Sequence, residues 1–121
     1  MEHSGFSIGD VKQSITGYRA GNVPVIVRAP TSKYHHIARA LDAGADAISI
    51  PMVNTAEEAE KIVNNMKYPP VGNRGVAPGL ANDRYKPGDV TASLADANDR
   101  IACIIFIETK EGTPQFSQNH N

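Results

Sequence analysis

The sequence predicts an α/β protein built on a parallel sheet. Short runs of almost uniformly apolar residues alternate with stretches whose apolar residues recur at helical spacing, and strands buried on both faces of a parallel sheet have this uniform character. The chain has 121 residues, of which 40% are hydrophobic, which is enough for one domain with its own core. A closed eight-stranded βα barrel usually takes ~250 residues, so this chain has about half the length of one.

Three apolar runs predict the strands, and they lie at residues 23–28, 47–51 and 101–107. Apolar residues at helical spacing precede the first two runs, over residues 8–18 and 34–41. Gly21 and Gly44 supply the stops that end these two helices. The order helix, strand, helix, strand is typical of parallel pairing.

The middle of the chain predicts a third helix and then a long loop. Thr55 and Glu58 form a capping-box pattern before an apolar stripe, and Pro69-Pro70 prevents the helix from continuing. Residues 71–89 are rich in Gly and Pro and indicate a functional loop, with a very short strand around residues 75–77.

The end of the chain predicts one more helix–strand unit and a tail. A poorly capped helix is expected over residues 90–98, before the last apolar run. Residues 113–121 show no periodicity and predict a frayed, disordered tail. The expected organisation is therefore one domain over residues 1–112, followed by a tail unrelated to it.

Charge and composition exclude several classes of partner. The formal net charge is −1, and acidic and basic residues are interspersed, which argues against nucleic acid and anionic membrane surfaces as partners. The longest apolar run falls far short of the ~20 residues of a membrane span, and no signal-peptide pattern opens the chain. The single cysteine, Cys103, lies in an apolar run and reads as a small buried hydrophobe. A cytoplasmic protein without disulfides is expected.

Reactive side chains stand where predicted strands end. Arg28 follows the first strand, Glu108 follows the last, and Glu2-His3 opens the chain. In βα barrels, catalytic groups come from the carboxyl ends of several strands, because the loops there converge on one mouth. A cation, a carboxylate and an imidazole at neighbouring strand ends are therefore a candidate active site.

Six motifs carry a family resemblance. They are Glu2-His3-Ser4-Gly5, Val27-Arg28-Ala29-Pro30, Leu41-Asp42-Ala43-Gly44-Ala45-Asp46, Ile50-Pro51-Met52-Val53, Tyr68-Pro69-Pro70-Val71-Gly72-Asn73-Arg74-Gly75 and Ile107-Glu108-Thr109-Lys110-Glu111-Gly112. In this order and spacing, the chain resembles the metal-dependent pyruvate aldolases typified by 4-hydroxy-2-oxoheptanedioate aldolase, 2-keto-3-deoxyrhamnonate aldolase and macrophomate synthase. The resemblance runs from Met1 to about Gly112 and is specific, because all the motifs are in register.

The resemblance implies a partial (β/α)8 TIM barrel of the phosphoenolpyruvate/pyruvate type, about strands 2 to 6 only. It implies a lyase that cleaves 4-hydroxy-2-oxo acids to pyruvate and an aldehyde with a divalent metal, Mg²⁺, Mn²⁺ or Co²⁺. A small 2-oxo acid is the implied substrate, and full-length relatives are implied to be homo-oligomers, trimers or hexamers. Cleavage leaves an enolate of pyruvate, whose negative charge a divalent cation can stabilise as a Lewis acid.

The resemblance also assigns roles to residues of this chain. Glu108 matches a metal ligand, Arg28 matches the arginine that donates to the former keto oxygen, and His3 matches the base that removes the aldol hydroxyl proton. The segments after the second strand and after the third helix are the implied substrate-binding positions, and they contribute Pro51, Met52, Arg74 and Gly75. For the last two, a turn that simply needs glycine explains the pattern as well.

The chain also departs from the family pattern. The aspartate that pairs with the histidine would fall before Met1, and the second metal-ligating aspartate falls where residues 113–121 stand. Phe106 replaces a glutamine that many members place beside the metal. A second hypothesis is therefore a non-catalytic half-barrel fragment or interaction module. His35-His36 is not expected to bind metal, because adjacent helical residues point apart.

Overall fold

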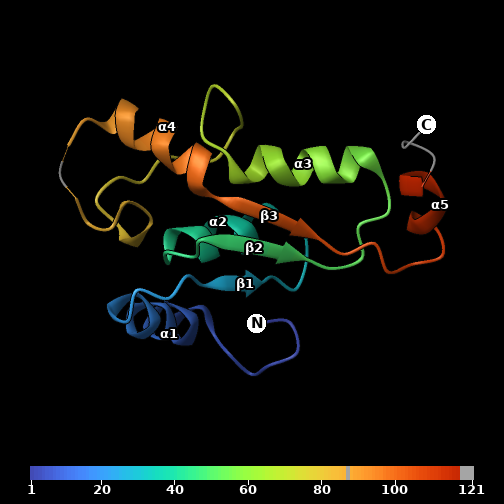
Figure 1. The fold of residues 1–121 in the computed structure, drawn as a ribbon, viewed down its shortest axis with the longest axis horizontal. Coiled ribbons are helices and arrows are strands. Elements are labelled where there is room, and N and C mark those ends of the chain that lie inside the picture. Colours follow the sequence, from blue (N-terminus) through green and yellow to red (C-terminus); the bar gives the residue numbers. More distant parts are fainter. Residues whose placement is uncertain (87, 118–121) are drawn as a thin grey trace.

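The computed structural model describes residues 1–86 and 88–117, with helices and strands alternating along the chain (Figure 1). In chain order the elements are α1 (Ile8–Ala20), β1 (Ile26–Arg28), α2 (Tyr34–Asp42), β2 (Ala47–Ile50), α3 (Ala56–Met66), the 3-10 turn η1 (Ala81–Asp83), α4 (Val90–Arg100), β3 (Ala102–Ile105) and α5 (Gly112–Ser117). The predicted strands are confirmed, each within shorter bounds than expected.

The three strands form one parallel sheet in the order β1-β2-β3. Val27 lies beside Ile48, and Ile48 beside Cys103, so the strands are in step across the sheet. Figure 1 shows the strands pointing the same way, with α2 behind them and α1 next to β1. Their carboxyl ends therefore meet at one edge, which is where the sequence predicted the reactive side chains to gather.

The core lies between the sheet and its helices. Its buried residues include Val11 and Ile15 of α1, Ile37 and Leu41 of α2, Ile48 and Ile50 of β2, and Ile62 and Met66 of α3. Side chains alternate between the two faces of a strand, so Ile26 and Ile104 point to the face opposite Val27 and Cys103. Ile26 and Ile104 are 59% and 39% exposed, so this second face is incompletely covered at both outer strands.

The capping box predicted at the start of the third helix is confirmed. The hydroxyl of Thr55 accepts a hydrogen bond from the Glu58 N–H, and the Glu58 carboxylate accepts from the Thr55 N–H. Ser7 and Asp10 form the same reciprocal arrangement at the start of α1. Both boxes satisfy amides that would otherwise lack partners in the first turn.

The expected short strand around residues 75–77 does not form, which corrects the predicted strand count. The Asn73 N–H donates to the Asn64 carbonyl and the Arg74 N–H to the Lys67 carbonyl, so the backbone entering this segment is bound to the end of α3. β2 pairs directly with β3, and the sheet of the described residues has three strands, whereas the resemblance implied strands 2 to 6.

The end of the chain also differs from the expectation of a disordered tail. Residues 112–117 form α5, which begins where the Gly112 N–H donates to the Thr109 hydroxyl and the Thr113 N–H to the Thr109 carbonyl. Residues 118–121, the rest of the predicted tail, lie outside the described residues.

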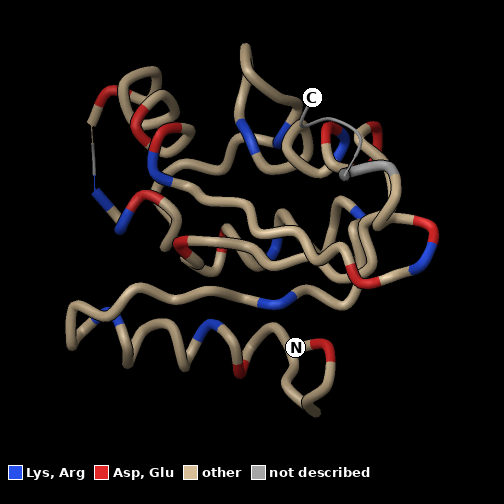
Figure 2. Tube along the Cα trace, turned by 45° about the vertical axis from the view of Figure 1, so that its right-hand side comes forward, with Lys and Arg blue, Asp and Glu red and all other residues tan. Residues whose placement is uncertain are grey.

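Charged residues of both signs are spread along the described trace (Figure 2). No helix in residues 1–86 or 88–117 is long and apolar enough to cross a membrane.

Candidate active site

The carboxyl ends of β1 and β3 bring Arg28 and Glu108 together. Nη2 of Arg28 lies 3.6 Å from Oε1 of Glu108, although the two residues are far apart in sequence. Nε of Arg28 also donates to a carboxylate oxygen of Glu2, so the guanidinium lies between two carboxylates. The structure thus places Arg28 and Glu108 on one rim of the sheet, as their positions at strand ends predict.

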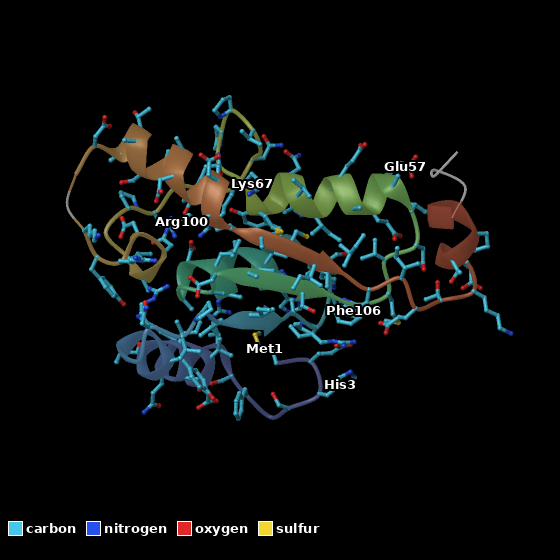
Figure 3. The ribbon with its side chains drawn as sticks, in the orientation of Figure 1. Met1, His3, Glu57, Lys67, Arg100 and Phe106 are labelled. Atoms are coloured by element: carbon cyan, nitrogen blue, oxygen red, sulfur yellow. The ribbon has the colours of Figure 1, made fainter. Side chains whose placement is uncertain are left out.

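An aromatic ring packs against the same guanidinium. Cζ of Arg28 lies 4.6 Å from the centre of the Phe106 ring, within the range of a cation–π contact. Phe106 stands where the family pattern has glutamine, so a polar side chain is replaced by an apolar surface beside Arg28. In Figure 3 the labels of Phe106 and His3 lie near each other at the lower right, and those of Lys67 and Arg100 lie higher and farther left.

The loop after β2 holds Glu108 in place. Oε1 of Glu108 accepts a hydrogen bond from the Met52 N–H at 3.1 Å. Met52 has a φ of +52°, a left-handed conformation that costs a residue with a side chain roughly 1 kcal/mol. Pro51, the buried residue between β2 and Met52, lies at the same strand end. Of the predicted substrate-binding positions, Met52 is therefore in direct contact with the rim.

His3 joins the rim through Glu2. Nε2 of His3 lies 3.3 Å from Oε2 of Glu2, the oxygen that also binds Arg28. The His3 side chain is 78% exposed, whereas that of Glu2 is only 14% exposed. Sequence reasoning assigned a role to His3 and none to Glu2, yet Glu2 is the residue that links His3 to Arg28. Its place in the first family motif was the available signal.

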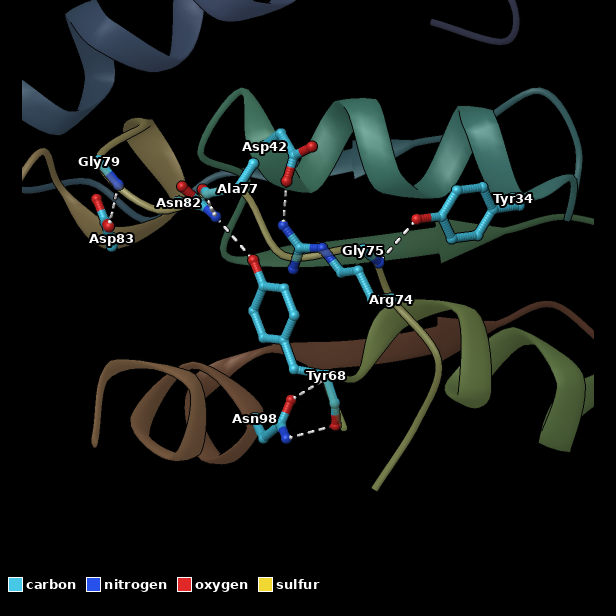
Figure 4. Close-up of polar contacts among 10 residues, drawn as sticks. All are labelled: Tyr34, Asp42, Tyr68, Arg74, Gly75, Ala77, Gly79, Asn82, Asp83 and Asn98. Carbon is cyan, nitrogen blue, oxygen red and sulfur yellow. Dashed lines mark hydrogen bonds and ion pairs between the residues drawn. The ribbon is translucent and has the colours of Figure 1, made fainter. Parts of the chain in front are cut away.

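Arg74 and Gly75 lie elsewhere, although the sequence predicted that they bind substrate with Arg28. Arg74 is buried, its Nη2 lies 2.6 Å from Oδ1 of Asp42, and its Cζ lies 4.4 Å from the centre of the Tyr68 ring (Figure 4). Asp42 is the last residue of α2. Because α2 runs back from the carboxyl end of β1, the Asp42–Arg74 ion pair lies toward the amino ends of the strands, away from Arg28 and Glu108. The Gly75 N–H donates to the Tyr34 hydroxyl.

The Arg74 region forms a separate polar network. The Tyr68 hydroxyl accepts a hydrogen bond from Asn82, and the Tyr68 backbone exchanges hydrogen bonds with the Asn98 side chain (Figure 4). Burial raises the pKa of the Tyr68 hydroxyl, against the opposing effect of the nearby Arg74 charge. These contacts tie the 67–82 segment to α2 and α4, which is a structural role.

The described donors do not complete a metal site. No group of three His, Cys, Asp or Glu side chains within residues 1–86 and 88–117 could hold a metal ion. Oε1 of Glu108 already accepts from Met52 and faces the positive guanidinium of Arg28, which repels a dication. Glu108 alone is a poor Mg²⁺ site, because this ion demands near-octahedral oxygen coordination. A cavity of about 530 Å³, lined by Tyr68, Asn82 and Leu94 among others, does not include the rim residues either.

Comparisons with known proteins agree with the resemblance drawn from the motifs. The model of the family described as HpcH/HpaI aldolase/citrate lyase matches residues 1–117. A hydroxypyruvate/pyruvate aldolase from Roseovarius nubinhibens is 34% identical over 111 residues, which are 92% of this chain and 43% of the relative. A 2-keto-3-deoxy-L-rhamnonate aldolase from Klebsiella pneumoniae is 32% identical over 90% of this chain and 40% of the relative.

The fold has a close counterpart among solved structures. An HpcH/HpaI aldolase from Desulfitobacterium hafniense superimposes with a TM-score of 0.88 and 30% sequence identity, over 95% of this chain and 44% of that one. The chain thus spans less than half the length of the relatives that it matches.

Proposed function

Because the chain belongs to the HpcH/HpaI aldolase/citrate lyase family, we propose that it supplies part of the active site of an aldolase that cleaves 4-hydroxy-2-oxo acids to pyruvate and an aldehyde. The observation that carries this proposal is the position of Arg28, between Glu2 and Glu108 at the carboxyl ends of parallel strands. The relatives named as pyruvate and 2-keto-3-deoxy acid aldolases support the substrate class.

The rim residues suit the chemistry of this cleavage. When the C3–C4 bond breaks, its electron pair stays on C3 and forms the enolate of pyruvate, with negative charge on the former keto oxygen. Arg28 donates to that oxygen, an interaction that strengthens as the charge develops. His3 takes the proton of the aldol hydroxyl as general base, directly or through water. Glu2 orients both side chains.

The divalent metal belongs to this proposal as a prediction. Glu108 is the described residue that would bind Mg²⁺, Mn²⁺ or Co²⁺, and the remaining donors would come from substrate and from outside the described residues. The partial (β/α)8 barrel, the cytoplasmic location and assembly of full-length relatives into trimers or hexamers likewise stay predictions. The parallel sheet and the match to less than half of each relative support a partial barrel.

The second candidate function is a non-catalytic half-barrel, and the incomplete metal site favours it for the isolated chain. We expect the purified chain to release little or no pyruvate from a 4-hydroxy-2-oxo acid with Mg²⁺ or Mn²⁺ present. Removal of a residue that only orients a metal ligand commonly costs ~10–100-fold, and an absent ligand costs more. Robust pyruvate release by the chain alone, measured with a coupled lactate dehydrogenase assay, would contradict this expectation.

A chimera tests the aldolase proposal itself. Residues 1–112 of this chain replace the corresponding segment of the Roseovarius nubinhibens aldolase, so that the relative supplies the rest of its own barrel. We expect a folded chimera that releases pyruvate from a 4-hydroxy-2-oxo acid. Arg100→Met in the chimera is a control that removes an arginine on the surface of α4, where it pairs with Asp96, and it should leave pyruvate release unchanged. The proposal fails if the chimera is folded, binds metal and yet releases no pyruvate.

A further inference from the structure

The two carboxylates beside Arg28 do not by themselves fix the plane of its guanidinium. Nε of Arg28 donates a hydrogen bond to Glu2, and Nη2 lies 3.6 Å from Oε1 of Glu108. The second distance exceeds that of a charge-assisted hydrogen bond, so Glu108 attracts the positive charge without orienting the group. One hydrogen bond at Nε still allows the guanidinium plane to tilt. A third contact is therefore needed to set that plane.

The ring of Phe106 supplies this contact. Cζ of Arg28 lies over the ring, 4.6 Å from its centre. A cation is attracted to the negative face of an aromatic ring, and the attraction is stronger where water is excluded. The Arg28 side chain is 34% exposed and Phe106 is partly buried, so the contact is partly shielded from water. The ring face thus restricts the tilt that the hydrogen bond to Glu2 leaves open.

The backbone of Phe106 is itself held by the end of β2. Its N–H donates to the Ile50 carbonyl, and its carbonyl accepts from the Val53 N–H. Between these two residues lies Met52, whose N–H donates to Glu108. The short segment 50–53 therefore holds both Phe106 and Glu108. Side chains supported in this way keep their geometry better than side chains on an unsupported loop.

We propose that Phe106 is a positioning residue for the proposed cleavage, whose ring aligns the guanidinium of Arg28 with the former keto oxygen as negative charge develops there. This inference rests on the proposed function. Neither Nη atom of Arg28 donates a hydrogen bond to a residue in 1–86 or 88–117, so both can donate to that oxygen. Phe106 acts through Arg28 and touches no reacting atom in this role. Its alignment matters because a displacement of ~1 Å can cost ~100-fold in rate.

Nuclear magnetic resonance of the purified, 15N-labelled chain tests the alignment without catalysis. A proton held over the face of an aromatic ring resonates upfield, and the Arg28 Nε–H signal is identified by its loss in Arg28→Lys. In Phe106→Leu this signal should move downfield, whereas Phe106→Tyr keeps the ring and should keep the signal in place. Tyr18→Leu removes an exposed ring from α1 and should not move the signal. An Arg28 signal that stays unchanged in Phe106→Leu would overturn the proposal.

Kinetics in the chimera test the role of the ring in the reaction. Phe106→Leu keeps an apolar side chain without a ring face, so it should lower kcat by ~10-fold or more and change KM little, because the lost alignment matters most in the transition state. Phe106→Tyr should retain a kcat close to that of the parent chimera. Tyr18→Leu is the control for loss of a ring away from the rim, and it should leave kcat and KM unchanged.

The outcomes separate this inference from the proposed function. If the parent chimera releases pyruvate and folded Phe106→Leu has the parental kcat, the positioning role is overturned while the proposed function stands. The same holds if Phe106→Tyr loses as much kcat as Phe106→Leu, because a role met by the ring face should survive the added hydroxyl. A folded, metal-binding parent chimera that releases no pyruvate overturns both, since no cleavage is then left for Arg28 to assist.

Discussion

Replacing Asp42 with alanine should destabilise the fold strongly, because it leaves the buried charge of Arg74 without its partner. The Arg74 side chain is 0% exposed and makes its ion pair with Asp42, which is 30% exposed. Nε and Nη1 of Arg74 have no hydrogen-bond partner within the described residues. Loss of Asp42 would therefore leave a guanidinium with no compensating negative charge and no access to water.

The magnitude follows from the burial of the two partners. Removal of one partner of a buried pair typically costs ~3–5 kcal/mol. Since Asp42 is partly exposed, we expect about 3 kcal/mol, which is a large share of the ~5–15 kcal/mol that stabilises a typical domain. Arg74→Met removes the charge and keeps an apolar chain against Tyr68, so it should cost ~1 kcal/mol or less.

Urea unfolding, followed by far-ultraviolet circular dichroism, measures these differences. The matched control is Asp96→Ala, which breaks the exposed Asp96–Arg100 pair and should cost less than ~0.5 kcal/mol. The double variant Asp42→Ala/Arg74→Met should be more stable than Asp42→Ala alone. The reasoning is refuted if Asp42→Ala is as mild as the control, or if Arg74→Met costs as much as Asp42→Ala.

Two further predictions concern stability. Gly72→Ala should cost ~1–3 kcal/mol, because an added Cβ would lie 2.5 Å from the Asn64 carbonyl oxygen, whereas Gly17→Ala on the open surface of α1 should stabilise by ~1 kcal/mol; urea midpoints check both. Burial raises the pKa of the Cys103 thiol above its ordinary 9.0, so its contribution to stability is complete below that pH and is lost as the pH rises through the folded pKa. Urea midpoints should fall at alkaline pH, and an equal fall in Cys103→Ala would contradict this assignment.

The sequence was sufficient to predict the strands and the rim. Runs such as 101–107 are short and almost uniformly apolar, which is typical of strands in a parallel sheet, and the carboxyl ends of such strands lie at one end of the sheet. Arg28 and Glu108 therefore meet for a reason that is readable in the sequence. The capping box at Thr55 is equally local, because its two hydrogen bonds join residues three apart.

Other features depend on contacts that no local pattern shows. Arg74 is bound by Asp42, which is distant in sequence, so its motif alone could not distinguish a substrate ligand from a buried ion pair. A very short strand was plausible over residues 75–77, but the backbone just before them is hydrogen-bonded to the end of α3. Glu2 was overlooked although it belongs to the first family motif, because no local pattern shows that a carboxylate near the start of the chain pairs with Arg28, which is distant in sequence.

The central claim, that the Arg28–Glu108 rim rather than Arg74 carries the aldolase chemistry, is tested most directly by kinetics in the chimera. The measurement is kcat/KM for pyruvate release by Arg28→Met, Glu108→Gln and Arg74→Met, each verified as folded. We expect at least a ~100-fold loss for Arg28→Met, since removal of one preorganised charge-stabilising donor commonly costs that much. Glu108→Gln removes the charge of the predicted metal ligand and should cost more than the ~10–100-fold that follows loss of a residue that only orients a ligand. Arg74→Met should retain activity close to that of the parent chimera. Near-parental activity of Arg28→Met, or an equal loss in folded Arg74→Met, would contradict the assignment.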